Sequence, residues 1–315
     1  MKVGLYSISY SGTWYNDKPA LTVEEVIDKA KKYGYDGVEI DLKRPHGSPI
    51  DLDERRCAEI RAYAEQQGIE ICGVAANNNF ASPVPEHIEN ELLMVREQIR
   101  VARQLGAPVL RLFAAWRGIT FRNGIATYEV TRKMDHFYDS LDYEVRQRIT
   151  ECFRECAKWA EEAGVTLALQ NHEPVIRSYT DMLDFVRWVG SPRFRCCLDA
   201  PNCGLTEKTQ SDEYLEQAVK DVGDLQTISH ANGELREEDG RVVMFPYEAR
   251  LPIYPNYRAF IRALAAQGYE GYINYEFCHM PFYDGKVLGF AYVDRQVELA
   301  QRYFRDLIQE AQAMK

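Results

Sequence analysis

A short unit recurs along this chain: an amphipathic segment, then a glycine, then a run of β-branched and aliphatic residues. The five clearest copies have Gly34, Gly68, Gly106, Gly164 and Gly268 at the junction. A glycine there suits the left-handed residue that ends a helix and returns the chain to a strand. Strand-like segments at 2–8, 194–199 and 225–230 bring the alternating units to eight. Such alternation predicts parallel strands with helices between them.

Eight units of this kind predict an α/β fold, a (β/α)8 TIM barrel, and the 315 residues suit one barrel domain over 1–315. An open doubly wound sheet is the competing fold, but it usually has a glycine-rich turn after the first strand. The segment Tyr6-Ser7-Ile8-Ser9-Tyr10 is not such a turn. The connections after the strands are long, at 10–21, 77–85, 115–140, 200–210, 231–256 and 278–293. We therefore expect long loops on the C-terminal face of the strands, where such barrels build their active sites.

The net charge of −10 argues against a nucleic-acid partner, because such a surface needs a basic stripe. No apolar run approaches the length that crosses a bilayer, and no signal peptide precedes the first strand. The eight cysteines contain no CxxC pair, which favours buried thiols in a reducing compartment. We expect a cytoplasmic protein without a membrane partner.

Polar residues follow four of the predicted strands at the point where each strand ends. The apolar run Val165–Leu169 leads into Gln170, and later strands lead into Asp199, His230 and Glu276. Because side chains alternate along a strand, Gln170 and His172 should point the same way. An amide oxygen, two carboxylates and an imidazole suit a divalent cation, Mn²⁺, Mg²⁺ or Co²⁺, with Mn²⁺ our first choice.

These segments resemble the xylose isomerase-like TIM barrels, the superfamily of sugar phosphate isomerases and epimerases that includes tagatose 3-epimerase-type enzymes. The resemblance extends over nearly the whole chain. It rests on Gly37–Ile40, Leu167–His172, Cys197–Asn202, Ser229–Glu234 and Asn274–Glu276. The resemblance implies metal ligands at Gln170, Asp199, His230 and Glu276. It also implies a substrate-binding arginine six residues after the ligand histidine, which is Arg236 here.

Two positions depart from the family pattern. The family usually has Glu where Gln170 stands, and often His where Asn202 stands; we keep Asn202 as a substrate-binding candidate. In the epimerases, the first and last metal-bound Glu act as a pair of acid/base groups. A Gln side chain cannot accept a proton at neutral pH, so one half of that pair is missing.

His172 could replace the missing base, since an imidazole is a natural proton-transfer group near neutral pH. We expect His172 and Glu276 to divide the acid/base work on a keto sugar. The alternative is that His172 only orients its neighbours or lies satisfied in the core. Trp116 belongs to an aromatic set in the long loops that suits stacking on a sugar ring, and His279, in a loop at the same face, is a further candidate for substrate contact. Glu39 and Arg111 are expected to face the barrel interior in a buried structural ion pair, with substrate binding as the alternative for these two residues.

The predicted function is a divalent-metal-dependent sugar isomerase or epimerase that removes a proton next to a metal-bound carbonyl. The alternative is a lyase: β-elimination on a 3-keto-glycoside, similar to the C-glycoside deglycosidase large subunit, or dehydration of a keto-inositol or dehydroshikimate-type compound. The DNA repair enzymes of this fold need more ligands and a basic groove. A metal-free sugar-binding barrel is the remaining alternative. The expected partner is a small carbohydrate, without phosphate, and the resemblance allows a homo-oligomer or a small partner subunit.

Overall fold

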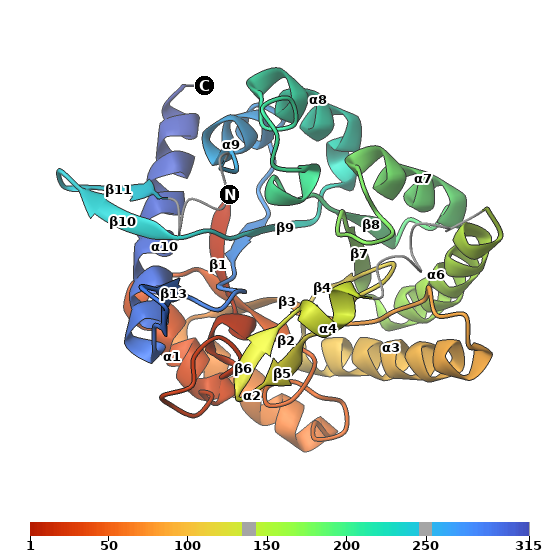
Figure 1. Cartoon of the computed structure of the whole chain (residues 1–315). Coiled ribbons are helices and arrows are strands. Elements are labelled where there is room, and N and C mark those ends of the chain that lie inside the picture. Colours follow the sequence, from red (N-terminus) through yellow and green to blue (C-terminus); the bar gives the residue numbers. More distant parts are fainter. Residues whose placement is uncertain (134–142, 246–253, 315) are drawn as a thin grey trace.

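The computed structural model describes residues 1–133, 143–245 and 254–314. Eight parallel strands form its central sheet in the order β8-β7-β4-β3-β2-β1-β12-β9, so strands that follow one another in the barrel sequence are neighbours (Figure 1). The strands are β1 (Lys2–Tyr6), β2 (Gly37–Asp41), β3 (Glu70–Ala75), β4 (Val109–Leu112), β7 (Thr166–Gln170), β8 (Phe194–Cys197), β9 (Ile228–Ala231) and β12 (Tyr272–Tyr275). The predicted (β/α)8 barrel is confirmed.

The sheet closes at a seam between β8 and β9. There the two strands are joined by a parallel bridge of Cys196 with Gln226, and the amide of Thr227 donates to the Cys196 carbonyl at 3.0 Å. The side-chain amide of Gln226 continues the pairing: its oxygen accepts from the Leu198 amide at 2.9 Å, and its nitrogen donates to the Leu198 and Ile228 carbonyls. A side chain therefore supplies hydrogen bonds that backbone supplies elsewhere in the ring.

Helices surround the ring of strands (Figure 1). They are α1 (Val23–Tyr33), α2 (Glu54–Gln67), α3 (Pro85–Leu105), α4 (Glu129–Arg132), α6 (Tyr143–Ala163), α7 (Tyr179–Val189), α8 (Asp212–Val222), α9 (Tyr257–Ala266) and α10 (Phe290–Ala313). The five junction glycines all have positive φ, between 71° and 81°, as the sequence predicted. Thr22 forms a capping box with Glu25 at the start of α1.

The interior of the barrel has an apolar and a polar level. Val109, Ala168, Cys197 and Ile228 form a buried cluster inside the ring, against which Tyr272 packs. Other positions of the same strands that face inward are polar and buried: Glu39, Arg111, His230 and Asn274. A larger apolar core fills the space between strands and helices. Buried polar groups need partners, so their presence marks the level at which the barrel builds a site.

Several predicted boundaries were wrong. The first strand ends at Tyr6, because Ser7–Tyr10 forms a 3-10 turn in which the Ser7 hydroxyl accepts from the Asp41 amide at 2.9 Å. Residues 223–225 form another 3-10 turn, so β9 begins only at Ile228. The last helix, which the sequence places at roughly 294–313, begins at Phe290, whose amide donates to the distant carboxylate of Asp17 at 2.7 Å. Contacts between remote segments set these boundaries.

Three of the long loops contain two-stranded hairpins. They are β5 (Thr120–Arg122) with β6 (Ile125–Thr127), β10 (Leu235–Glu238) with β11 (Arg241–Met244), and β13 (Phe282–Tyr283) with β14 (Lys286–Val287). All follow the carboxyl ends of barrel strands. The β10–β11 hairpin projects outward beside α10 (Figure 1).

Asp294 of α10 ties the end of the chain to its beginning. Its carboxylate accepts from the Tyr10 hydroxyl at 2.6 Å, from Lys29 at 2.7 Å and from the Tyr33 hydroxyl at 2.8 Å. Burial opposes the charged form, but the bonds from Lys29 and the two tyrosines hold the pKa of Asp294 below the usual value of an aspartate. Hydrogen bonds to a charged group contribute about 1.5–3 kcal/mol each.

Asp294→Asn is expected to lower the free energy of unfolding by about 2 kcal/mol at neutral pH. Because the folded-state pKa is depressed, this contribution is present above the unfolded pKa and is lost as the pH falls through the folded value. The difference from wild type should therefore shrink below pH 4, as urea titrations across pH would measure. Asp306→Asn, at an exposed position of the same helix, is the control. An equal loss in both variants would contradict the role of Asp294.

The eight cysteines are all free thiols, and all but Cys278 are buried, as expected. Across the described ranges, no helix combines the length and apolar character needed to span a bilayer.

Candidate active site

The polar residues at the ends of β7, β8, β9 and β12 meet, as the sequence predicted. Gln170 Nε2 donates to Asp199 Oδ2 and lies 3.3 Å from His230 Nδ1. The Glu276 Oε2 atom lies 3.8 Å from the same Nδ1. Asp199 Oδ1 also accepts the backbone amide of His230 at 2.6 Å. Gln170 and Glu276 therefore approach the same imidazole nitrogen, and Asp199 contacts both Gln170 and the backbone of His230.

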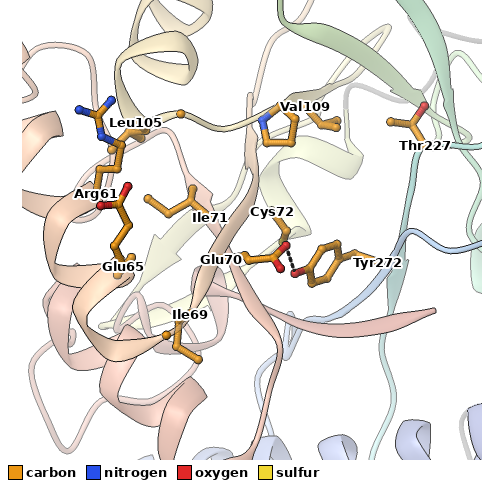
Figure 2. A pocket seen from close by; sticks show the side chains of 14 residues that line it. Arg61, Glu65, Ile69, Glu70, Ile71, Cys72, Leu105, Val109, Thr227 and Tyr272 are labelled. Carbon is orange, nitrogen blue, oxygen red and sulfur yellow. Dashed lines mark hydrogen bonds between the residues drawn. The ribbon is translucent and has the colours of Figure 1, made fainter.

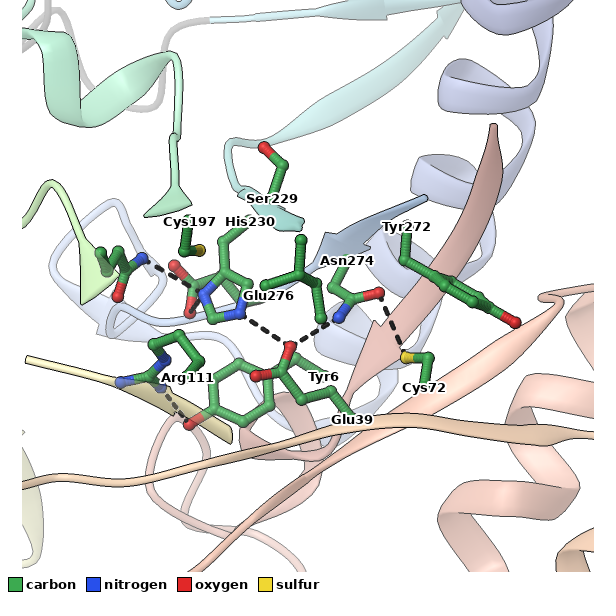
Figure 3. Close-up of polar contacts among 12 residues, drawn as sticks. Tyr6, Glu39, Cys72, Arg111, Cys197, Ser229, His230, Tyr272, Asn274 and Glu276 are labelled. Carbon is green, nitrogen blue, oxygen red and sulfur yellow. Dashed lines mark hydrogen bonds and ion pairs between the residues drawn. The ribbon is translucent and has the colours of Figure 1, made fainter. Parts of the chain in front are cut away.

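Glu39 orients this imidazole from the other side. Its Oε2 lies 2.7 Å from His230 Nε2 and accepts from Asn274 Nδ2 at 2.5 Å (Figure 3). Burial disfavours a charged imidazole, but the carboxylates of Glu39, Glu276 and Asp199 raise the pKa of His230 to about 9. A histidine that binds a metal usually has a carboxylate on the ring nitrogen that does not contact the metal. In His230, Glu39 lies at Nε2, while Nδ1 faces Gln170 and Glu276.

The two predicted carboxylate ligands both have raised pKa values. Burial is the main cause for Asp199, although the charge of His230 and the bond from Gln170 oppose it. Burial also raises the pKa of Glu276, assisted by the negative charges of Asp199 and Glu39 and opposed by His230 and Arg111. Crowded buried carboxylates of this kind gain stability from a cation placed among them.

The residues fit a divalent cation in their chemistry. Gln170 Oε1 is buried and has no hydrogen-bond partner, and a half-turn of the amide would place it where Nε2 now contacts Asp199 and His230. The cluster then presents two carboxylates, an amide oxygen and an imidazole nitrogen. Within the described residues, no group of three or more His, Cys, Asp or Glu side chains has the spacing of a ready-made metal cage.

A small pocket of about 60 Å³ opens beside this cluster. Gln170 and Glu276 form part of its wall, together with the predicted residues His172 and Trp116. The Trp116 ring stacks on Phe113 with centroids 5.0 Å apart and meets His172 edge-on at 5.2 Å. Ile119 and Tyr128, which flank the β5–β6 hairpin, and Trp14 contribute further apolar wall. Aromatic walls with a few polar groups are typical of small-molecule sites.

His172 is poised as a neutral imidazole. Its Nδ1 lies 2.5 Å from the Glu173 carbonyl oxygen, which can only accept, so Nδ1 carries the hydrogen and Nε2 keeps a free lone pair. Burial lowers the pKa of His172 to about 4, and the positive charges of Arg111 and Arg117 act in the same direction. The strand ends at Gln170, so the alternation argument does not strictly reach His172, yet both side chains line the pocket.

The other predicted substrate-binding residues lie in different surroundings. Asn202 Nδ2 donates to Asp199 Oδ2 at 3.2 Å, next to the cluster. Arg236 lies on the exposed β10 strand and pairs with Glu238, and it is not part of the pocket wall. His279 Nε2 lies 2.6 Å from the buried Glu234 carboxylate, also outside that wall. Substrate contact by Arg236, Asn202 and His279 stays a prediction.

The expected ion pair between Glu39 and Arg111 does not form in the described structure. Glu39 bonds His230 and Asn274, while Arg111 donates to the Ala76 carbonyl at 2.8 Å and to the Tyr6 hydroxyl at 2.9 Å. Both side chains do face the barrel interior, as expected. Which inward groups pair depends on how the strands are staggered around the ring, and a single strand's sequence does not report that.

Sequence reasoning also missed two polar residues of the pocket, Lys43 and Asn77. Each lies two residues beyond a strand end, after Asp41 and Ala75. The signal that found Gln170 and Asp199, a polar residue directly after an apolar strand, applies to these positions too. Asn77 Nδ2 donates to Asp41 Oδ1 at 2.7 Å, and Lys43 Nζ lies 3.3 Å from Asp41 Oδ2.

A larger cavity, of about 740 Å³, lies at the opposite end of the barrel, where β3, β4, β9 and β12 begin (Figure 2). Its principal polar groups are already paired: Glu70 accepts from Lys2 at 2.5 Å and from the Tyr272 hydroxyl at 2.7 Å. The N-terminal end of such a barrel usually serves stability, so we place the active site at the other end.

Eight parallel strands form a closed ring, and acid, amide and imidazole groups gather at the carboxyl ends of these strands. This is the arrangement of a (β/α)8 barrel that carries its site where the enzymes of this fold have their active sites. The family described as "Xylose isomerase-like TIM barrel" matches residues 27–307, and the chain belongs to that family.

Known relatives of this chain act on sugars. Fructoselysine 3-epimerase of Shigella flexneri is 24% identical over 290 residues, covering 89% of this chain and 91% of the relative. The structure of L-ribulose 3-epimerase has a TM-score of 0.68 at 17% identity, covering 99% of this chain and 96% of the other. The apo structure of 3-keto-D-glucoside 4-epimerase from E. coli has a TM-score of 0.64 at 18% identity and covers 99% of both chains. The two structures support the fold alone.

Proposed function

We propose that this protein is a divalent-metal-dependent epimerase or isomerase that acts on a small, unphosphorylated keto sugar by moving a proton at the carbon beside the carbonyl. The observation that carries the proposal is the placement of two proton-transfer groups, His172 and Glu276, in one pocket next to the cluster of Gln170, Asp199 and His230. The relative fructoselysine 3-epimerase supports the reaction class.

The protonation properties of His172 and Glu276 suit two different steps, removal of a proton from the carbon and its return. His172 is neutral with a free Nε2, so it can accept the proton that leaves the carbon. Burial raises the pKa of Glu276, so this carboxyl group holds a proton more readily than an exposed one and can return it to the carbon. Gln170 can do neither.

The proton transfer conserves atoms and charge. As the proton passes to His172, the C–H electron pair becomes a carbon–carbon double bond and the carbonyl oxygen takes up the negative charge. Return of a proton from Glu276 to the other face of the same carbon gives the epimer. Return of the proton to the former carbonyl carbon, while the hydroxyl proton of the adjacent carbon passes to the negative oxygen, gives the isomer. A divalent cation held by Gln170, Asp199, His230 and Glu276, with Mn²⁺ the first choice, would polarise the carbonyl as a Lewis acid.

Solvent exchange tests this function directly. The protein with Mn²⁺ in D₂O is expected to exchange the proton beside the carbonyl of at least one sugar in a panel of D-fructose, D-tagatose, D-psicose, L-ribulose, fructoselysine and a 3-keto-D-glucoside. Proton NMR follows both the exchange and the appearance of the epimer. A chelator should stop it. Absence of exchange across the panel would contradict the proposal. None of the relatives named above is a lyase, and a released aglycone in the same spectra would reveal that alternative.

A further inference from the structure

Three buried polar atoms of the pocket residues lack a hydrogen-bond partner. They are the donors Arg111 Nε and Trp14 Nε1 and the acceptor Gln170 Oε1. An unsatisfied buried polar atom costs about 1–3 kcal/mol, so each one calls for an explanation. Gln170 Oε1 is accounted for by the cation cluster. The two donors belong to side chains that are no more than 2% exposed, and the described part of the chain offers no acceptor to either.

Two of the three guanidinium nitrogens of Arg111 have hydrogen-bond partners among the described residues, and Nε is the nitrogen without one. One terminal nitrogen donates to the Ala76 carbonyl and the other to the Tyr6 hydroxyl, while the guanidinium lies 4.2 Å from the centre of the Phe113 ring. Figure 3 shows Arg111 beside Tyr6, together with the hydrogen bond that joins the two side chains. Arginine stays charged in proteins, so its Nε–H is a fixed, cationic donor that needs no reorganisation.

The summed charge of the side chains in and around the pocket indicates whether the substrate is neutral or anionic. Lys43 and Arg111 are positive, whereas Glu276 in the wall and Glu39, Asp41 and Asp199 behind it are acidic. With His230 neutral as a metal ligand and the four carboxylates ionised, a divalent cation in the cluster would bring the formal charge of these groups to zero. The pocket therefore has no surplus positive charge to attract an anionic substrate. It suits a neutral molecule in which negative charge arises only during the reaction.

We propose that Arg111 Nε and Trp14 Nε1 donate hydrogen bonds to oxygen atoms of a neutral keto sugar, and that Arg111 is a catalytic residue that stabilises the negative oxygen formed during proton transfer. This inference rests on the proposed function. It assigns to Arg111 a role in substrate binding and charge stabilisation, where the sequence favoured a structural ion pair over substrate binding.

Kinetics of Arg111 variants test the charge role. Arg111→Lys and Arg111→Gln are expected to lower kcat by about 10²–10³-fold, the usual loss when an oxyanion donor is removed, with a much smaller change in KM. Arg100→Lys is the matched control, because Arg100 is also partly buried but bonds Glu97, Gln104 and the Leu52 carbonyl with its nitrogens, away from the pocket. It should keep wild-type kcat. A loss in KM alone, or a kcat loss no larger than in the control, overturns the catalytic role.

The indole signals of the unmodified protein provide a test that does not depend on turnover or on the folding of Arg111 variants. The chain has four tryptophans, so Trp14→Phe assigns the Trp14 Nε1–H signal and Trp116→Phe that of Trp116. Saturating ketose from the panel is expected to shift the Trp14 signal downfield. A ketose that shifts Trp116 but leaves Trp14 unchanged overturns the donor pair, and so does the absence of any shift with every ketose. Binding shifts without solvent exchange would refute the proposed reaction while leaving the donor pair intact.

Discussion

Wild-type protein incubated with Mn²⁺ and then desalted is expected to retain close to one equivalent of the ion, and Asp199→Ala protein to retain almost none. Asp199 is completely buried, and its two oxygens contact Gln170, Asn202 and the His230 amide. Removal of a residue that only hydrogen-bonds to a metal ligand lowers metal affinity by about 10–100-fold. Removal of a ligand itself should therefore lower the affinity by more than about 100-fold. Elemental analysis of desalted samples measures the bound ion.

Two comparison variants separate ligation from folding. Asp199→Asn preserves the shape and an acceptor for the His230 amide, but it removes the charge and should also weaken metal binding. Asp184→Ala, at a half-buried position of α7 where the carboxylate pairs with Arg187, should bind like wild type. Equal metal content in wild type and Asp199→Ala would place the ion elsewhere. A wild-type protein that retains no ion would leave the metal-free sugar-binding barrel as the better reading.

His172→Ala is expected to lower the rate of proton exchange by about 10²–10⁴-fold, the range that general acid–base groups contribute. The substitution removes the only uncharged imidazole of the pocket wall but leaves Gln170, Asp199 and His230 in place, so metal content should not change. Exchange of the proton beside the carbonyl, measured by NMR at saturating ketose, reports the chemical step.

His87→Ala is the matched control, because His87 is exposed near the start of α3 and contacts Ser82. It should exchange at the wild-type rate. Full exchange in His172→Ala would show that another group takes the proton, and it would return His172 to an orienting role. A parallel loss of metal in His172→Ala would instead show that the variant disturbs the cluster.

The fold and the four clustered residues were predictable for the same physical reason. Parallel strands that alternate with helices all end at one face, so polar residues placed directly after apolar runs must meet there. Gln170, Asp199, His230 and Glu276 satisfied that condition in the sequence, and they meet in the structure. The helix-ending glycines were also predictable, because positive φ is a local requirement.

Partner choice inside the barrel was not predictable. Glu39 and Arg111 both point inward, but the stagger of the strands brings Glu39 to His230 and Arg111 to Tyr6. The structure of the long loops was not predictable for a related reason. The β10–β11 hairpin, which carries Arg236, begins soon after the end of β9, yet it places the arginine at an exposed position beside Glu238. Such outcomes depend on long-range geometry, which spacing along the chain does not encode.

The seam between β8 and β9 lies directly beneath two of the proposed metal ligands, Asp199 and His230. On either side of it the strands are joined by continuous backbone ladders, whereas at the seam much of the pairing falls to the side chain of Gln226. The separation of those two ligands thus depends partly on one adjustable amide. We therefore expect this seam, rather than the backbone ladders on either side of it, to adjust when one divalent cation is replaced by another of different ionic radius.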